Sequence, residues 1–163
     1  MKPFKGIIAL IGALALALTL SLPASSQLIA PQSAVYVVHP TSAPTTVRTL
    51  TAQGAGTLTS SDQNGFGVIS VLCVFNTSAQ SGTPSTTFTI QGKDAASGNY
   101  YNIVTSSAIT ASATPTPLAV GRDVTTTANL SAGFPVPATW RVSTTVGGTT
   151  PSVTATISCV KQN

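Results

Sequence analysis

The segment Trp140–Cys159 reads WRVSTTVGGTTPSVTATISC, and its alternation of apolar and polar residues indicates β-structure. Every second residue on either side of its centre would face one way, and most of these residues are apolar: Trp140, Val142, Thr144, Val146, Val153, Ala155, Ile157 and Cys159. The central residues 147–151, GGTTP, are typical of a turn. We therefore predict a hairpin whose two arms pair with each other, with Trp140 in the core.

A second strand precedes this segment. Gly67–Phe75 reads GVISVLCVF, which is apolar on both faces and therefore belongs near the middle of a sheet. Asn76–Ser85 contains Gly82 and Pro84 and is interpreted as a loop. Strands are expected next at Thr86–Gln91, with Phe88 and Ile90 facing inward, and at Tyr100–Thr105.

The fold class follows from these short alternating runs. No stretch after Pro23 keeps helical spacing over three turns, and Ala111–Pro137 is expected to hold short edge strands and loops. About six to nine strands separated by turn signals predict an all-β protein with one antiparallel β-sandwich. We place this sandwich over residues 45–163, with an immunoglobulin-like or a jelly-roll-like topology.

The N-terminal residues have the pattern of a targeting segment. Lys2 and Lys5 are followed by the uncharged, apolar run Gly6–Leu22, and small residues come after Pro23. We predict a hydrophobic helix within residues 1–26, acting as a cleaved signal peptide or as a membrane anchor. Residues 27–44 would form an extended polar lead-in. Export or membrane attachment through this segment is expected.

The charge pattern bears on nucleic-acid binding. Only 6% of the residues are charged, there is no Glu, and the formal net charge is +4. Beyond the N-terminal segment the cationic residues are scattered along the chain: Arg48, Lys93, Arg122, Arg141 and Lys161. Because phosphate binding depends on clustered cations, we expect no nucleic-acid partner.

Residues suited to catalysis are few. His39 is the single histidine, and it lies in the polar lead-in, where a catalytic triad has little support. Asp94 and Asp123 are the pair of carboxylates that could meet, but three isolated aspartates are a weak basis for hydrolysis. Two Cys and one His fall short of a zinc site. We predict a protein that is not an enzyme, with no catalytic residues, no metal site and no cofactor.

The two cysteines are more informative. Cys73 and Cys159 both occupy the more apolar face of a predicted strand, so both should point into the core. In an exported protein such a pair is a disulfide candidate. Two buried free thiols are the alternative, because cysteine is common in cores.

Three separated motifs support a resemblance to known proteins. Thr86–Ala111 reads TTFTIQGKDAASGNYYNIVTSSAITA, Pro137–Val142 reads PATWRV, and Val146–Ser152 reads VGGTTPS. In this order they resemble a family of small tailed-phage and prophage proteins that are described as virion structural or head-decoration-like. The likeness extends roughly over Thr45–Val160, with gaps around Pro115–Pro135.

The resemblance implies a β-rich module that packs on a capsid or tail surface and carries no catalytic residues. We expect contacts from the loops at Gly92–Asn99 and Ala111–Pro137, with these candidate contact residues: Lys93, Asp94, Asn99, Tyr100 and Arg122. The protein would lie in the virion or outside the cell, and a homo-oligomer is compatible with this role. The alternative is a secreted or cell-surface β-sandwich that binds a surface protein or glycan.

Overall fold

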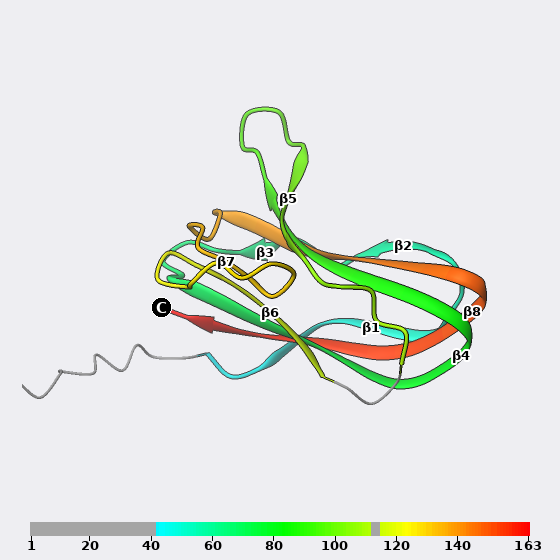
Figure 1. Cartoon of the computed structure of the whole chain (residues 1–163). Helices are drawn as coiled ribbons and strands as arrows, with labels where there is room; N and C mark the ends of the chain where they lie inside the picture. Colours follow the sequence, from blue (N-terminus) through cyan, green and yellow to red (C-terminus); the bar gives the residue numbers. More distant parts are fainter. Residues whose placement is uncertain (1–41, 112–114) are drawn as a thin grey trace, which may run out of the picture. The chain divides into compact units, whose positions relative to one another are not determined.

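Two strands of 24 residues each dominate the structure (Figure 1). The computed structural model describes residues 42–111 and 115–163. The strands in these residues are β1 (Thr45–Gln53), β2 (Gly56–Thr59), β3 (Gln63–Asn64), β4 (Ser70–Lys93), β5 (Tyr100–Thr105), β6 (Thr116–Gly121), β7 (Ser131–Ala132) and β8 (Thr139–Gln162). The described part of the chain contains no helix, and the predicted all-β class is confirmed.

The long strands β4 and β8 pair with each other in antiparallel orientation along almost their whole length. The pairing runs from Ser70 opposite Gln162 to Gly92 opposite Trp140. The prediction of a hairpin closing at residues 147–151 is therefore wrong, because both arms of that segment belong to β8 and pair with β4. Alternation shows that a segment is extended, but it does not identify the partner of the strand.

The segment Asn76–Ser85 was predicted to be a loop, and this prediction is also wrong, because it forms the middle of β4. Its Gly and Pro residues bend the strand without ending it. Register shifts occur near Ala79 and near Thr83, and such bulges bend a strand and increase its twist. The turn residues of β4 and β8 lie opposite each other in the pairing, since Pro84 is the partner of Gly148.

Two glycines allow this bend. Gly82 has φ 76° and Gly148 has φ 107°, in a region that L-residues with a side chain rarely adopt. A Cβ on Gly148 would lie 1.8 Å from the carbonyl oxygen of Thr83, and one on Gly82 would lie 2.3 Å from that of Thr150. The two backbones thus approach each other too closely at the bend for a side chain to fit.

Beyond the bend, the paired strands fold back over themselves (Figure 1). The rings of Phe75 in the first half of β4 and Phe88 in the second half stack with centroids 5.2 Å apart and an interplanar angle of 21°. The enclosed space holds one hydrophobic core of buried residues: Leu50, Val71, Cys73, Phe75, Phe88, Ile90, Val104, Ile109, Leu118, Val120, Trp140, Val142, Val146, Val153, Ala155, Ile157 and Cys159. The predicted inward positions of Phe88, Ile90 and Trp140 are confirmed.

The shorter strands attach to the folded pair. β1 pairs with the second half of β8, and β2 and β3 pair with its first half. β6 pairs with the first half of β4 and β5 with the second half. The sheet is mixed rather than purely antiparallel, because β6 and β7 run parallel. The predicted strand at Tyr100–Thr105 is β5, and Ala111–Pro137 holds the short strands β6 and β7 as expected.

The apolar run Gly67–Phe75 lies near the middle of the sheet, as predicted, but its strand begins at Ser70. In the first half of β4, every second residue faces the core. Val71 and Cys73 are buried, whereas Leu72 is 44% exposed. The alternating side chains are therefore covered on one face of the sheet only.

The two cysteines occupy directly opposite positions in the β4–β8 pairing, with Cα atoms 4.1 Å apart. Both side chains are buried, which confirms their predicted inward orientation. The sulfur atoms are 2.04 Å apart, as in a disulfide bond. The bond joins the two long strands within the core.

Residues 1–41 lie outside the described residues, and with them the predicted signal peptide or anchor, most of the polar lead-in and His39. Within residues 42–111 and 115–163, no helix is long and apolar enough to cross a membrane.

The bend predicts a difference between two glycine substitutions. Gly148→Ala should lower the free energy of unfolding by more than about 2 kcal/mol, because it combines an unfavourable φ with a backbone clash. Gly98→Ala is the matched control, since Gly98 also has a positive φ, 71°, but nothing within 4 Å of a Cβ. It should cost about 1 kcal/mol. Urea unfolding measures both, and equal losses would contradict the role of close packing at the bend.

The disulfide predicts a large effect of reduction. Cys73 and Cys159 are 86 residues apart in the chain, so opening the bond should destabilise the domain by about 4 to 5 kcal/mol on the chain-entropy model. Urea unfolding with and without dithiothreitol should show this loss. The Cys73→Ala, Cys159→Ala double variant is the control, because it should be insensitive to the reductant. An unchanged transition of the reduced wild-type protein would show that the bond contributes nothing.

Candidate functional site

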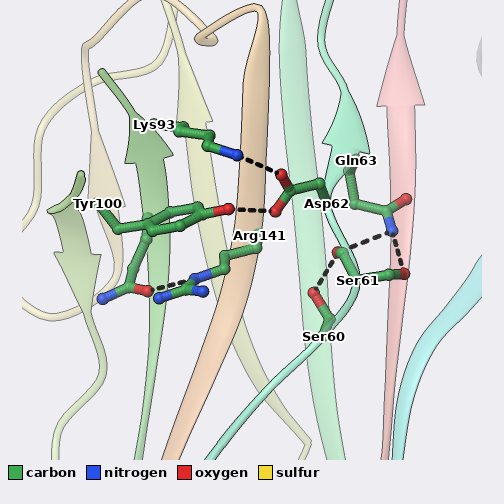
Figure 2. A network of polar contacts seen from close by, with 8 residues as sticks. Ser60, Ser61, Asp62, Gln63, Lys93, Tyr100 and Arg141 are labelled. Atoms are coloured by element: carbon green, nitrogen blue, oxygen red, sulfur yellow. Dashed lines mark hydrogen bonds and ion pairs between the residues drawn. The ribbon is translucent and has the colours of Figure 1, made fainter. Parts of the chain in front are cut away.

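A network of polar side chains lies on the outer face of the sheet where β3, β8, β4 and β5 lie side by side (Figure 2). On β8 and β4 the neighbours of these side chains in sequence, Trp140 and Ile90, point into the core, so the network residues point outward. The network joins side chains from four separate parts of the chain: Asp62, Gln91, Lys93, Tyr100, Asn102 and Arg141.

Asp62 is positioned by the segment that leads into β3. The buried Ser60 donates its backbone N–H to the carbonyl oxygen of Val142 at 2.8 Å, and its hydroxyl oxygen accepts the N–H of Val142 at 3.0 Å. Gln63 then pairs with Trp140 in the ladder. Asp62 is therefore held beside β8 by backbone bonds on either side of it.

The carboxylate of Asp62 accepts two hydrogen bonds from side chains on other strands. The hydroxyl of Tyr100 donates to one oxygen, and Nζ of Lys93 lies 3.0 Å from the other (Figure 2). The Tyr100 hydroxyl, followed by the Lys93 ammonium, lowers the pKa of Asp62 below its ordinary value of 3.8. The bond to Asp62 in turn raises the pKa of Lys93. The ion pair is open to solvent, which limits its contribution to stability.

Arg141 covers the ring of Tyr100. Its guanidinium carbon lies 3.3 Å from the ring centroid, and its Nε donates to the side-chain oxygen of Gln91 at 2.9 Å. Gln91 donates in turn to Asn102 at 2.8 Å. Nζ of Lys93 lies 5.3 Å from the centroid of the same ring. Tyr100 is thus held by one hydrogen bond and by cation–π contacts with two cations.

The arrangement has features that favour the binding of a partner. Tyr and Arg side chains are enriched among the residues that dominate protein interfaces, and a side chain that is already ordered loses less entropy on binding. Both carboxylate oxygens of Asp62 accept a hydrogen bond, one from the Tyr100 hydroxyl and one from the Lys93 ammonium. In residues 42–111 and 115–163, no three His, Cys, Asp or Glu side chains gather as a metal site would require.

The structure brings together two of the five predicted contact residues, Lys93 and Tyr100. Asp94 instead orders the turn between β4 and β5, because its carboxylate accepts hydrogen bonds from Ala96 and from Ser97. The hydroxyl of Ser97 is the main cause of a lowered pKa at Asp94. Asn99 closes the same turn through its backbone carbonyl, which accepts the N–H of Asp94 at 2.8 Å.

Arg122 lies elsewhere, in the turn after β6, next to Asp123, and has no hydrogen bond or ion pair with the network. Asp94 and Asp123, the carboxylates that could have formed a pair, lie in different turns, and no described contact joins them.

Sequence reasoning missed Asp62 and Arg141. For Arg141 a signal existed, since it follows the inward Trp140 and must point outward. It faces Gln91 only because β4 pairs with β8, and the hairpin prediction excluded that pairing. Asp62 is isolated in sequence between polar residues, and nothing near it indicates a role.

Comparisons of the chain with protein-family models, with curated proteins and with solved structures give no match.

The network predicts how Asp62 titrates. Tyr100→Phe removes the main cause of its lowered pKa, so the pKa should move up toward the ordinary value. Because the folded-state pKa is depressed, the stabilisation by ionised Asp62 is present at neutral pH and is lost as the pH falls through that pKa. Carboxyl-detected NMR titration measures the shift. Tyr101→Phe is the control and should leave it unchanged, and a similar shift in both variants would contradict the assignment.

Proposed function

We propose that the described domain is a single β-sandwich whose two layers are the two halves of the folded β4–β8 pair. The stack of Phe75 on Phe88 supports two facing layers, because these residues lie on opposite sides of the bend. A jelly-roll-like arrangement fits better than an immunoglobulin-like one, since both long strands pass from one layer to the other.

We propose that the protein is a non-enzymatic binding module that packs on a protein lattice, such as the capsid or tail of a virion. The observation that carries this proposal is the ordered stack of Arg141 on Tyr100, presented on a sheet face and bordered by Asp62 and Lys93. We call the outer surface around these four residues the Tyr100 face. An aromatic and an arginine side chain within a polar rim are typical of the centre of an interface.

The position of the Tyr100 face adds support. It includes Lys93, which lies within Gly92–Asn99, and Tyr100, which follows it, both in the segment that resembles virion proteins. It also includes Arg141, from the motif at Pro137–Val142. Two motifs that lie far apart in the sequence thus contribute to one surface. Because the family comparisons give no match, the proposal depends on this surface and on the order of the motifs.

A second candidate function is a secreted or cell-surface module that binds a surface protein or glycan. The bond between Cys73 and Cys159 favours it, because disulfides persist mainly in oxidising compartments outside the cytoplasm. The predicted signal peptide or anchor points the same way. Both functions need binding without turnover, and they differ in where the partner is located.

Association with particles tests the proposal. Tyr100→Ala should weaken the affinity of the protein for virions by about tenfold or more, because it removes the centre of the Tyr100 face. Co-sedimentation with virions purified from the organism that makes the protein measures this affinity. Tyr101→Ala is the matched control: this neighbouring tyrosine packs against Phe134 instead. Thermal unfolding of each variant separates a binding defect from misfolding.

Proteomics of the same particles provides an independent measurement. Absence of the protein from all particles, together with its recovery from the medium or the cell surface, would remove the virion function and favour the secreted module. Equal losses of binding in the two tyrosine variants would contradict the role of the Tyr100 face.

A further inference from the structure

A groove of about 490 Å³ lies beside the loop that connects β3 to β4, and none of the features described so far uses it. The residues of that loop, the turn after β6 and the segment before β8 line it, including Phe66, Arg122, Asp123 and Val136. Its volume is in the range of small-ligand sites, which is about 300–1,000 Å³.

Phe66 forms the rim of the groove. Its side chain is 78% exposed, more than any other large hydrophobic residue in the described part of the chain. The loop around it is held in place by its backbone: Gly65 donates to Ala138 at 2.9 Å, and Val68 donates to Gly65 at 3.2 Å. The N–H of Phe66 donates to the side chain of Asn64 at 2.9 Å. The exposed ring is therefore presented by an ordered loop.

The tight fit behind this loop points to the same conclusion. A Cβ on Gly65 would lie 2.0 Å from the carbonyl oxygen of Pro137, so the loop is pressed against the segment that precedes β8. The backbone that carries Phe66 is therefore fixed beside this segment, with the ring exposed. A molecule bound in the groove could cover the ring.

Arg122 and Asp123 form another part of the wall. They occupy the two central positions of a turn in which the N–H of Val124 donates to the carbonyl oxygen of Gly121 at 3.2 Å. Neither side chain forms a hydrogen bond or an ion pair with any residue in 42–111 or 115–163. One wall thus offers a donor and an acceptor of opposite charge side by side, and both are free to bind a ligand.

This combination selects a class of ligand. An anionic ligand would be attracted by Arg122 and repelled by Asp123, and a cationic ligand the reverse. For a ligand with a net charge, the two electrostatic contributions to the binding free energy therefore oppose each other. A neutral hydroxyl-rich ligand satisfies both, because each hydroxyl can accept from the guanidinium or donate to the carboxylate. A pyranose ring also has an apolar C–H face that can cover an aromatic ring.

We propose that this groove binds a neutral sugar unit, which stacks on Phe66 and is hydrogen-bonded by Arg122 and Asp123. The groove contains none of the four residues of the Tyr100 face, and its ligand does not depend on the proposed particle partner. It assigns a role to Arg122, which the Tyr100 face leaves without one.

NMR titration of the ¹⁵N-labelled full chain tests the proposal. The probes are the methyl glycosides of glucose, galactose and mannose, and N-acetylglucosamine, at up to about 50 mM. At least one should shift the amide signals of Gly65, Phe66, Gly67, Arg122 and Asp123 in a saturable manner. Glucuronate and glucosamine carry a charge on a similar ring and should bind several-fold more weakly.

Variants locate the binding. Phe66→Ala should weaken it about tenfold or more, whereas Leu72→Ala, which removes an exposed apolar side chain outside the groove, should leave it unchanged. Asp123→Asn should reduce the preference for neutral over anionic sugars. The absence of saturable shifts with every neutral sugar, shifts at other residues, or equal binding by the Phe66→Ala variant would overturn the proposal. Co-sedimentation of the Asp123→Asn variant with virions should be normal, because Asp123 lines the groove and not the Tyr100 face, which keeps this test separate from that of the Tyr100 face.

Discussion

The pairing of β4 with β8 determines the position of nearly every other element. All the remaining strands except β7 attach directly to one of these two, and the disulfide joins them at Cys73 and Cys159. Because the pair is bent, one backbone ladder supplies both sides of the core. The close approach of Gly148 to Thr83 is therefore a constraint on the whole domain, since a wider bend would separate Phe75 from Phe88.

The same pairing creates the Tyr100 face. Inward alternation of Ile90 and Trp140 requires that Gln91 and Arg141 point outward, and the register places these two residues opposite each other. Arg141 is thereby fixed against the ring of Tyr100, and both the packing of the core and the arrangement of the Tyr100 face depend on one register. A shift of one residue would bury the arginine and expose the tryptophan.

Local pattern was sufficient to predict the strand class, the inward cysteines and tryptophan, and the turn between β4 and β5. Local pattern was insufficient to predict which strands pair with each other. The turn residues of Gly147–Pro151 are compatible both with a chain reversal and with a bend inside one strand. Of the Tyr100 face, Lys93 and Tyr100 were predicted, since they border a turn recognisable by its composition. Asp62 was not, because its place beside β8 comes from the backbone bonds of Ser60, which lie far from β8 in sequence.

The length of the β4–β8 ladder has a consequence for how the domain folds. Ser70 and Gln162, which pair at one end of it, are 92 residues apart in the chain. During synthesis the residues of β4 emerge long before β8, the partner with which they form their longest pairing. Folding must therefore wait for β8 and then proceed cooperatively, with a time constant of about milliseconds to seconds, as expected of domains dominated by non-local pairing. Until β8 has been made, the apolar residues of the β4 segment remain open to contacts with other chains, so aggregation competes with folding during this interval.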